Sequence, residues 1–161
     1  MHRDNKLADD LIGDLAKVYR FTLDKKDMDL IPIMEETESL EPILNLFKAK
    51  YKEEGIKYSI NYSSDSNKYV IPGTMQLLLE NAIFQNIISA SIPLFFEVEI
   101  KENELKIKYS LNKKLRNSHR LEEQISKLKK AYRFYTNQQI DFEEKDRFVF
   151  INIPLLDLEE E

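Results

Sequence analysis

Apolar residues recur at helical spacing near the start of the chain. Between about residue 4 and residue 26 they form a broad stripe along one predicted helix: Leu7, Leu11, Ile12, Leu15, Val18, Tyr19 and Leu23. Acidic residues come early in this segment and basic residues late, which complements the helix dipole. Residues 35–54 repeat the helical spacing and end at Gly55, and Pro42 inside them predicts a kink or a restart. The pattern therefore predicts two consecutive amphipathic helices.

Strict alternation of apolar and polar residues begins at residue 56. Residues 56–62 alternate as a half-buried strand does, and the polar residues 63–68 predict a loop. The other predicted elements are a helix over 74–88, strands over 95–101 and 105–111 around a turn at 102–104, a helix over 120–134, and strands over 139–143 and 147–153 around a turn at 144–146. This order predicts an α/β two-layer sandwich, in which a mixed sheet carries helices on one face and a long N-terminal helix precedes it.

Composition and charge narrow the class of protein. With 161 residues, 42% of them hydrophobic and 33% charged, the chain has the size and balance of one globular domain. Its net charge of -5 argues against a nucleic-acid partner, because phosphate binding needs an excess of Lys and Arg. Without cysteine it has neither disulfides nor thiolate metal sites. No apolar run approaches about 18 residues, so we expect no direct membrane contact within this chain.

Candidate chemistry lies on the apolar helix that follows Pro72 and Gly73. The stretch IPGTMQLLLENAIFQN, residues 71–86, carries one adjacent polar pair, Glu80 and Asn81. An Asn oxygen is a hard ligand suited to Mg²⁺, and a Glu can accept a proton or order a water molecule. Such a pair also occurs on the solvated face of many amphipathic helices, so the surrounding motif decides between the two interpretations.

The stretch resembles the N box of the LytS-like sensor histidine kinases, a branch of the GHKL ATPases that works in bacterial two-component systems. That motif is roughly P-x-x-x-L-Q-x-L-V-E-N-A-I-K-H-N. The residues in register with it are Pro72, Gln76, Leu77, Leu79, Glu80, Asn81, Ala82, Ile83 and Asn86. A second block, residues 16–36, resembles L-S-x-V-Y-R-Y-x-L followed by V-x-L-x-E-E-L, which in the family belongs to the second helix of the dimerisation and phosphotransfer hairpin.

The resemblance assigns roles to particular residues. It makes Asn81 the ligand of the Mg²⁺ ion that bridges the triphosphate and Glu80 the catalytic base. It places Asn86, Gln85 and Ser110 at cofactor-binding positions. ATP and Mg²⁺ are the cofactors that it implies.

The chain departs from the family pattern around the nucleotide. Phe84 and Gln85 replace the usual Lys and His, and Tyr109 precedes Ser110 where the family has Asn-Asn. The family's lid is built on glycine boxes after the N box, but the three glycines here are Gly13, Gly55 and Gly73. In their place, residues 118–132 keep a helical pattern and bring Glu122 and Glu123 toward a polyanion.

Neither histidine resembles the family's phosphoacceptor. His2 and His119 lack the neighbours of a motif such as N-P-H-F-L-F-N, so both are expected to be surface residues and the acceptor is expected upstream of this chain.

The resemblance divides the chain into three expected segments. Residues 1–28 are the C-terminal helix of the hairpin, 29–156 the histidine-kinase-type ATPase domain, and 157–161 an acidic tail. The leading hypothesis is the cytoplasmic catalytic portion of a membrane-anchored sensor histidine kinase, a transferase that phosphorylates a histidine outside the chain. The resemblance further implies a homodimer through the N-terminal helix and a response regulator as partner.

Two alternatives remain open. One is a degenerate pseudokinase that acts as a dimerisation or response-regulator docking domain. The other is an unrelated α/β domain that binds a small molecule.

Overall fold

A five-stranded mixed sheet forms the centre of the computed structural model, which describes residues 2–115 and 119–158. The elements in chain order are α1 (His2–Lys25), β1 (Ile31–Pro32), α2 (Ile33–Glu38), α3 (Leu40–Tyr51), η1 (Glu53–Gly55), β2 (Ile56–Tyr62), β3 (Tyr69–Val70), α4 (Thr74–Gln85), β4 (Leu94–Ile100), β5 (Glu104–Ser110), α5 (His119–Tyr132), β6 (Asp141–Lys145) and β7 (Phe148–Pro154). The strand order is β2-β4-β5-β7-β6, with β2 parallel to β4 and the other neighbours antiparallel. The predicted mixed sheet is confirmed.

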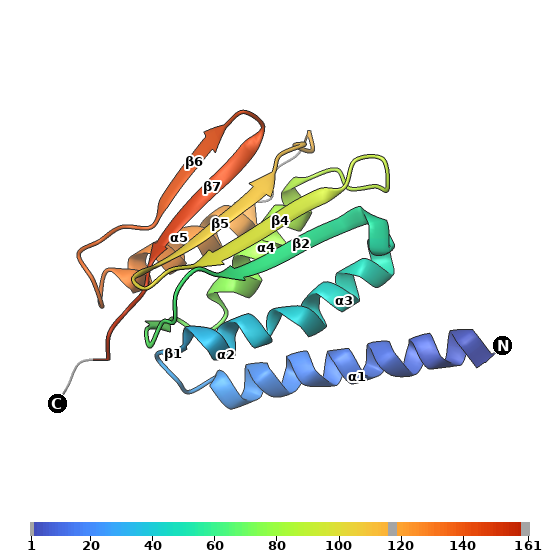
Figure 1. The fold of residues 1–161 in the computed structure, drawn as a ribbon, viewed down its shortest axis with the longest axis horizontal. Coiled ribbons are helices and arrows are strands. Elements are labelled where there is room, and N and C mark those ends of the chain that lie inside the picture. Colours follow the sequence, from blue (N-terminus) through green and yellow to red (C-terminus); the bar gives the residue numbers. More distant parts are fainter. Residues whose placement is uncertain (1, 116–118, 159–161) are drawn as a thin grey trace.

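Helices cover one face of this sheet, as predicted. In β4 the buried residues Phe96, Val98 and Ile100 alternate with Glu97 and Glu99, which point away from the core. Figure 1 shows α4 and α5 together behind the sheet, with α3 and then α1 beyond β2. The core lies between the sheet and these helices, and the opposite face of the sheet stays open to solvent.

The predicted second helix is divided in two. It ends at Ser39, whose hydroxyl donates to the Glu36 carbonyl at 2.6 Å, and α3 starts at the next residue. The restart at Leu40 therefore comes two residues before Pro42. Pro42 then lies in the first turn of α3, where its missing N–H removes no helical hydrogen bond.

The last hairpin turns later than predicted. Strand β6 continues to Lys145, which pairs with Phe148, and Asp146 and Arg147 form the turn with φ of 52° and 65°. Two consecutive residues with positive φ are the signature of a type I′ turn, which suits the twist of a hairpin. The short pair β1–β3 was not predicted, because two-residue strands leave no periodic signal.

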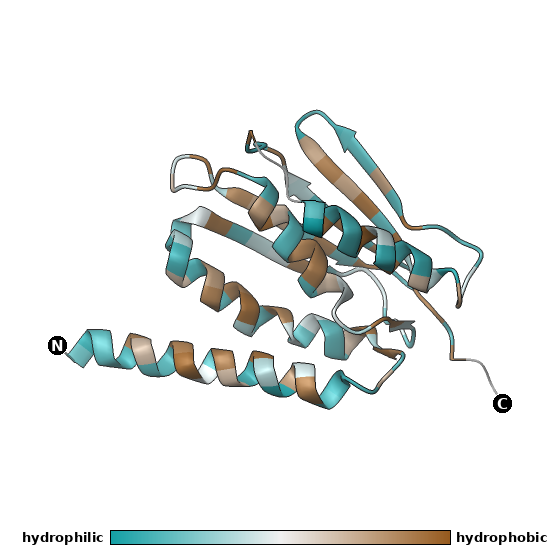
Figure 2. Ribbon diagram, turned by 180° about the vertical axis from the view of Figure 1, so that it is seen from behind, coloured by the Kyte–Doolittle hydropathy of each residue, from teal (hydrophilic) through white to brown (hydrophobic). Residues whose placement is uncertain are grey.

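Helix α1 lies along α3, on the outer side of the domain (Figure 1). Val18 and Phe21 are half-buried against the core, but no residue between 2 and 25 is fully buried. Figure 2 shows brown bands of hydrophobic residues alternating with teal along α1. A second group of large apolar side chains on this helix stays in solvent: Ile12 is 66%, Leu15 58%, Tyr19 65% and Leu23 51% exposed. No described helix is both long and apolar enough to cross a bilayer.

Candidate functional site

Helix α4 begins at a buried anchor that comes from another helix. Gly73, at φ 83°, is its N-cap residue, and Glu36 of α2 satisfies the first backbone donors. One Glu36 carboxylate oxygen accepts the Met75 N–H at 2.8 Å, and the other accepts the Gly73 N–H at 3.2 Å. Burial raises the pKa of Glu36 from its ordinary 4.5 to about 7, and the two backbone donors oppose this rise only in part. Glu36 therefore fixes where the N-box helix starts.

Asn81 and Gln85 lie one turn apart on α4 and meet Tyr109 of β5. The Tyr109 hydroxyl donates to Gln85 Oε1 at 2.9 Å, and Asn81 Nδ2 donates to the same hydroxyl at 3.4 Å. The Tyr109 ring is buried and stacks on Phe96, with the ring centroids 6.3 Å apart. Burial is the main cause of a raised pKa for Tyr109, which stays a neutral phenol.

These three side chains line a hollow of about 490 Å³ between α4, α5 and the strands β5, β6 and β7. Lys129 and Phe142 stand on its other side, with the ammonium 4.6 Å from the ring centroid. The hollow also has two carboxylates: Glu122 on α5, and Glu144, which pairs with Lys113 at 2.9 Å. None of the three glycines lies among its lining residues, so it has no glycine-built cradle for phosphate. Amides, a phenol and an aromatic face remain to bind a ligand.

The other predicted site residues do not enter this hollow. Glu80 accepts a hydrogen bond from Gln76 Nε2 at 3.1 Å, one turn earlier on the same helix. Ser110 Oγ accepts the Phe95 backbone N–H at 3.0 Å. The structure thus brings together Asn81 and Gln85 but not Glu80 or Ser110, whose catalytic and nucleotide-binding roles stay predictions.

Asn86 is buried at the C-terminal end of α4, and both the nitrogen and the oxygen of its side-chain amide are hydrogen-bonded to backbone groups. Its Nδ2 donates to the carbonyls of Ala82 at 2.7 Å and Ser110 at 3.1 Å, while its Oδ1 accepts the Asn112 N–H at 2.5 Å. These bonds fasten the helix end to the chain after β5. The cofactor role of Asn86 also stays a prediction.

A Mg²⁺ ion at this hollow would take most of its ligands from phosphate and water, because the lining residues supply few. Asn81 supplies a single amide oxygen, and Glu144 is already engaged with Lys113. A hard cation takes about six oxygen ligands. Across the described residues, no three acidic or histidine side chains are grouped to hold a metal ion.

Two residues that shape the site were not predicted as site residues. The alternation of Leu105, Ile107 and Tyr109 already placed Tyr109 on the helix-facing side of its strand, and this signal was sufficient to find it. Glu36 gave a weaker signal, because an acidic residue on an amphipathic helix is normally exposed.

Comparison with known proteins supports the fold. No protein-family model matches the chain, and no curated protein matches it. Among solved structures, the histidine kinase AdeS of Acinetobacter baumannii aligns over 90% of this chain and 76% of its own, with 11% identity and a TM-score of 0.50. The cytoplasmic segment of histidine kinase QseC aligns over 83% and 80%, with 13% identity and a TM-score of 0.49. The catalytic domain of histidine kinase ThkA aligns over 79% and 93%, with 12% identity and a TM-score of 0.47.

The likeness to AdeS, at so low an identity, concerns the fold and not the activity. The chain has the α/β sandwich fold of histidine-kinase ATPase domains, which confirms the predicted fold class.

Proposed function

We propose that this chain is the dimerisation helix and ATPase-fold domain of a LytS-like bacterial sensor kinase, and that the domain acts as a pseudokinase. It works in the cytoplasm as part of a membrane-anchored protein and docks a response regulator without transferring phosphate itself. The observation that carries this proposal is the hydrogen-bonded trio of Tyr109, Gln85 and Asn81 on the wall of the hollow.

The trio replaces one group that a nucleotide needs. Tyr109 holds a buried phenol beside the position where the resembled kinases accept the adenine amino group. Asn81, the residue expected to bind Mg²⁺, donates to that phenol through Nδ2, which leaves only its single Oδ1 for a metal ion. The same opening offers a triphosphate no excess of positive charge, because Glu122 offsets Lys129 and Glu144 is paired with Lys113.

ATP binding is expected in the millimolar range or below detection by isothermal titration with Mg²⁺ present. Losing one well-placed acceptor costs about 1–3 kcal/mol, or roughly 5- to 150-fold in affinity. Any residual Mg²⁺ dependence disappears in Asn81→Ala and persists in Asn61→Ala, a matched change on the open sheet face. Micromolar affinity for ATP contradicts the pseudokinase proposal. Such an affinity supports the kinase hypothesis, in which Asn81, a lining residue of the hollow, binds the Mg²⁺ ion of the nucleotide.

The proposed homodimer forms through the part of α1 that stays exposed. Helical spacing in the sequence predicts a broad apolar stripe along this helix, and the domain covers part of that stripe. Leu11 and Val18 are partly covered, Val18 by the domain core, whereas Ile12, Leu15, Tyr19 and Leu23 form a continuous exposed stripe. Two-fold pairing buries such a stripe from both sides at once.

Ile12→Glu combined with Tyr19→Glu is expected to convert the dimer to a monomer in light scattering at micromolar concentration. Each large apolar side chain contributes about 1.5–3 kcal/mol when fully buried, and a carboxylate cannot replace it. The control places the same side chain on the polar face of α1, as Lys6→Glu combined with Arg20→Glu, and stays dimeric. A wild-type monomer rules out α1 as a dimerisation element.

A further inference from the structure

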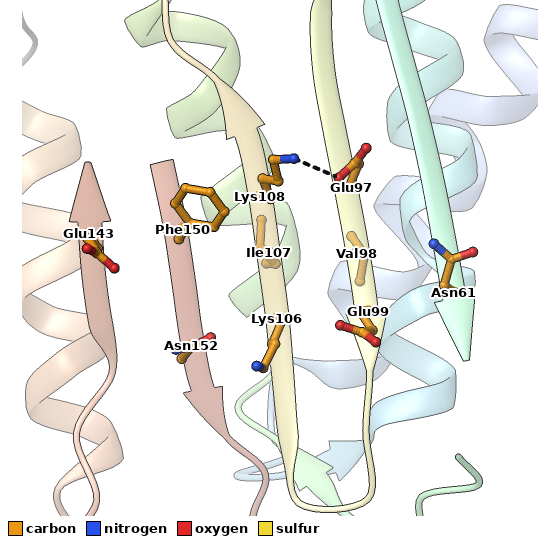
Figure 3. Close-up of a pocket in the computed structure, with 10 residues that line it drawn as sticks. All are labelled: Asn61, Glu97, Val98, Glu99, Lys106, Ile107, Lys108, Glu143, Phe150 and Asn152. Atoms are coloured by element: carbon orange, nitrogen blue, oxygen red, sulfur yellow. Dashed lines mark ion pairs between the residues drawn. The ribbon is translucent and has the colours of Figure 1, made fainter. Parts of the chain in front are cut away.

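The open face of the sheet presents side chains in three rows that cross all five strands. Figure 3 shows most of the two lower rows, with Lys108 beside Glu97 in one and Lys106 beside Glu99 in the other. The third row lies nearer the start of β2 and consists of Lys57, Phe95, Ser110, Phe148 and Lys145. We call it the lysine–phenylalanine row.

Strand register holds this row in line. Lys57 pairs with Phe95, Ser110 pairs with Phe148, and Phe148 pairs with Lys145. The Phe95 N–H donates a hydrogen bond to Ser110 Oγ, which connects the Lys57–Phe95 pair to the residues of β5, β7 and β6 in the row. Two phenylalanines therefore flank one small residue, and a lysine stands at each end. Phe95 is 42% exposed although it belongs to a strand of the central sheet.

Charge separates this row from the rest of the open face. It contains two lysines and no acidic residue, whereas the two lower rows contain Glu97, Glu99, Asp141 and Glu143. Among the described residues, Lys57 and Lys145 form no ion pair, while Lys108 pairs with Glu97 at 3.7 Å. The Lys57 ammonium lies 5.6 Å from the Phe95 ring centroid, and the Lys108 ammonium of the next row lies 4.5 Å from the Phe148 ring centroid. On an acidic chain, the row is thus a local cationic and aromatic site.

We propose that the lysine–phenylalanine row binds an acidic peptide segment of a partner protein. The peptide lies across the strands, places an apolar side chain over Ser110 between the two rings, and sets a carboxylate on each terminal lysine. Lys57 and Lys145 stand four strand spacings apart, about 19 Å, which about six extended residues span. The row is separate from the hollow at Asn81, Gln85 and Tyr109, which opens on the other face of the sheet.

The narrowness of the row favours a peptide over other anionic partners. A bilayer surface or a nucleic acid contacts a wide basic area, but the neighbouring row carries Glu97 and Glu143 beside Lys108. That row offers no excess of positive charge to an anion that extends past the lysine–phenylalanine row on that side. An extended peptide can keep its carboxylates within the row itself.

A fluorescein-labelled peptide, Glu-Glu-Ser-Leu-Ser-Glu-Glu, tests the proposal by fluorescence anisotropy at low salt. Lys57→Glu combined with Lys145→Glu is expected to weaken binding by about tenfold or more. The control, Lys127→Glu combined with Lys130→Glu on exposed positions of α5, has the same change in net charge and keeps the affinity within about twofold. Amide resonances of the ¹⁵N-labelled protein shift around the row and not around Asn81.

A second variant separates a loss of binding from a loss of folding. Phe95→Leu keeps an apolar residue at an exposed position and removes the ring, and it is expected to weaken the peptide several-fold without altering the circular dichroism spectrum. The same peptide with lysine in place of glutamate does not bind. Absence of binding by the wild-type protein overturns the proposal, as does an equal loss in the α5 control. Binding of phosphatidylserine vesicles or single-stranded DNA through Lys57 and Lys145, without peptide binding, also overturns it.

Discussion

Raising the pH from 5 to 8 is expected to lower the free energy of unfolding by about 2–3 kcal/mol through one carboxyl group, Glu36. Its pKa is about 7 in the folded chain and 4.5 when unperturbed. The folded state therefore holds this proton more tightly than the unfolded state does. The resulting stability is fully present below pH 4.5 and is lost as the pH rises through 7, because the ionised carboxylate is buried without a cation to pair it.

Urea unfolding at several pH values measures this contribution. The side chain of the Glu36→Gln variant cannot ionise. Between pH 5 and 8 the free energy of unfolding of this variant therefore falls less than that of the wild type, and the difference equals the contribution assigned to Glu36. Glu38→Gln, an exposed carboxyl on the same helix, retains the wild-type dependence on pH. A Glu36→Gln variant that follows the wild-type curve contradicts the assignment.

Asn86→Ala is expected to lower the free energy of unfolding by about 2–4 kcal/mol, whether or not ATP is present. The substitution leaves two carbonyls and one N–H without the partner they have in the folded chain. Each buried polar group left unpaired costs about 1–3 kcal/mol, with some recovered by relaxation or water. Thermal and urea unfolding measure the loss.

Two further variants serve as comparisons for Asn86→Ala. Asn81→Ala, one and a half turns earlier on the same helix, removes one long hydrogen bond at a partly exposed site and is expected to cost less than about 1 kcal/mol. Asn86→Asp preserves the acceptor for Asn112 but turns an oxygen toward the carbonyls of Ala82 and Ser110, so it is expected to be as damaging as alanine. A stable Asn86→Ala variant with altered ATP binding restores the nucleotide role predicted from the sequence.

Periodicity predicted most of the fold because each element is amphipathic on its own. Strand β2 has the predicted bounds, and β4 and β5 differ from them by one residue at each end. The errors arose where a local contact overrides periodicity. Ser39 ends α2 through its bond to Glu36, and positive φ at Asp146 and Arg147 moves the last turn. Neither effect has a periodic signature.

The candidate site was predicted less completely, because its hydrogen bonds join distant segments. The motif placed Asn81 on the helix that the structure has as α4, where Asn81 lines the hollow. It could not indicate that Asn86 bonds to the Ser110 carbonyl, 24 residues away. Nor could it place Glu36 at the start of α4, since that contact depends on how α2 packs against α4.

Because α1 buries little of its surface, it can separate from the domain under native conditions. Its backbone amides are protected by helical bonds, yet no side chain between residues 2 and 25 is fully buried and one ion pair, Lys25 with Glu35, ties its last turn to α2. Releasing such an element takes much less free energy than unfolding the sheet. In a separated subunit, amide hydrogen exchange in α1 therefore proceeds through detachment of the helix alone, while the amides of β5 and β7 exchange only when the whole domain unfolds.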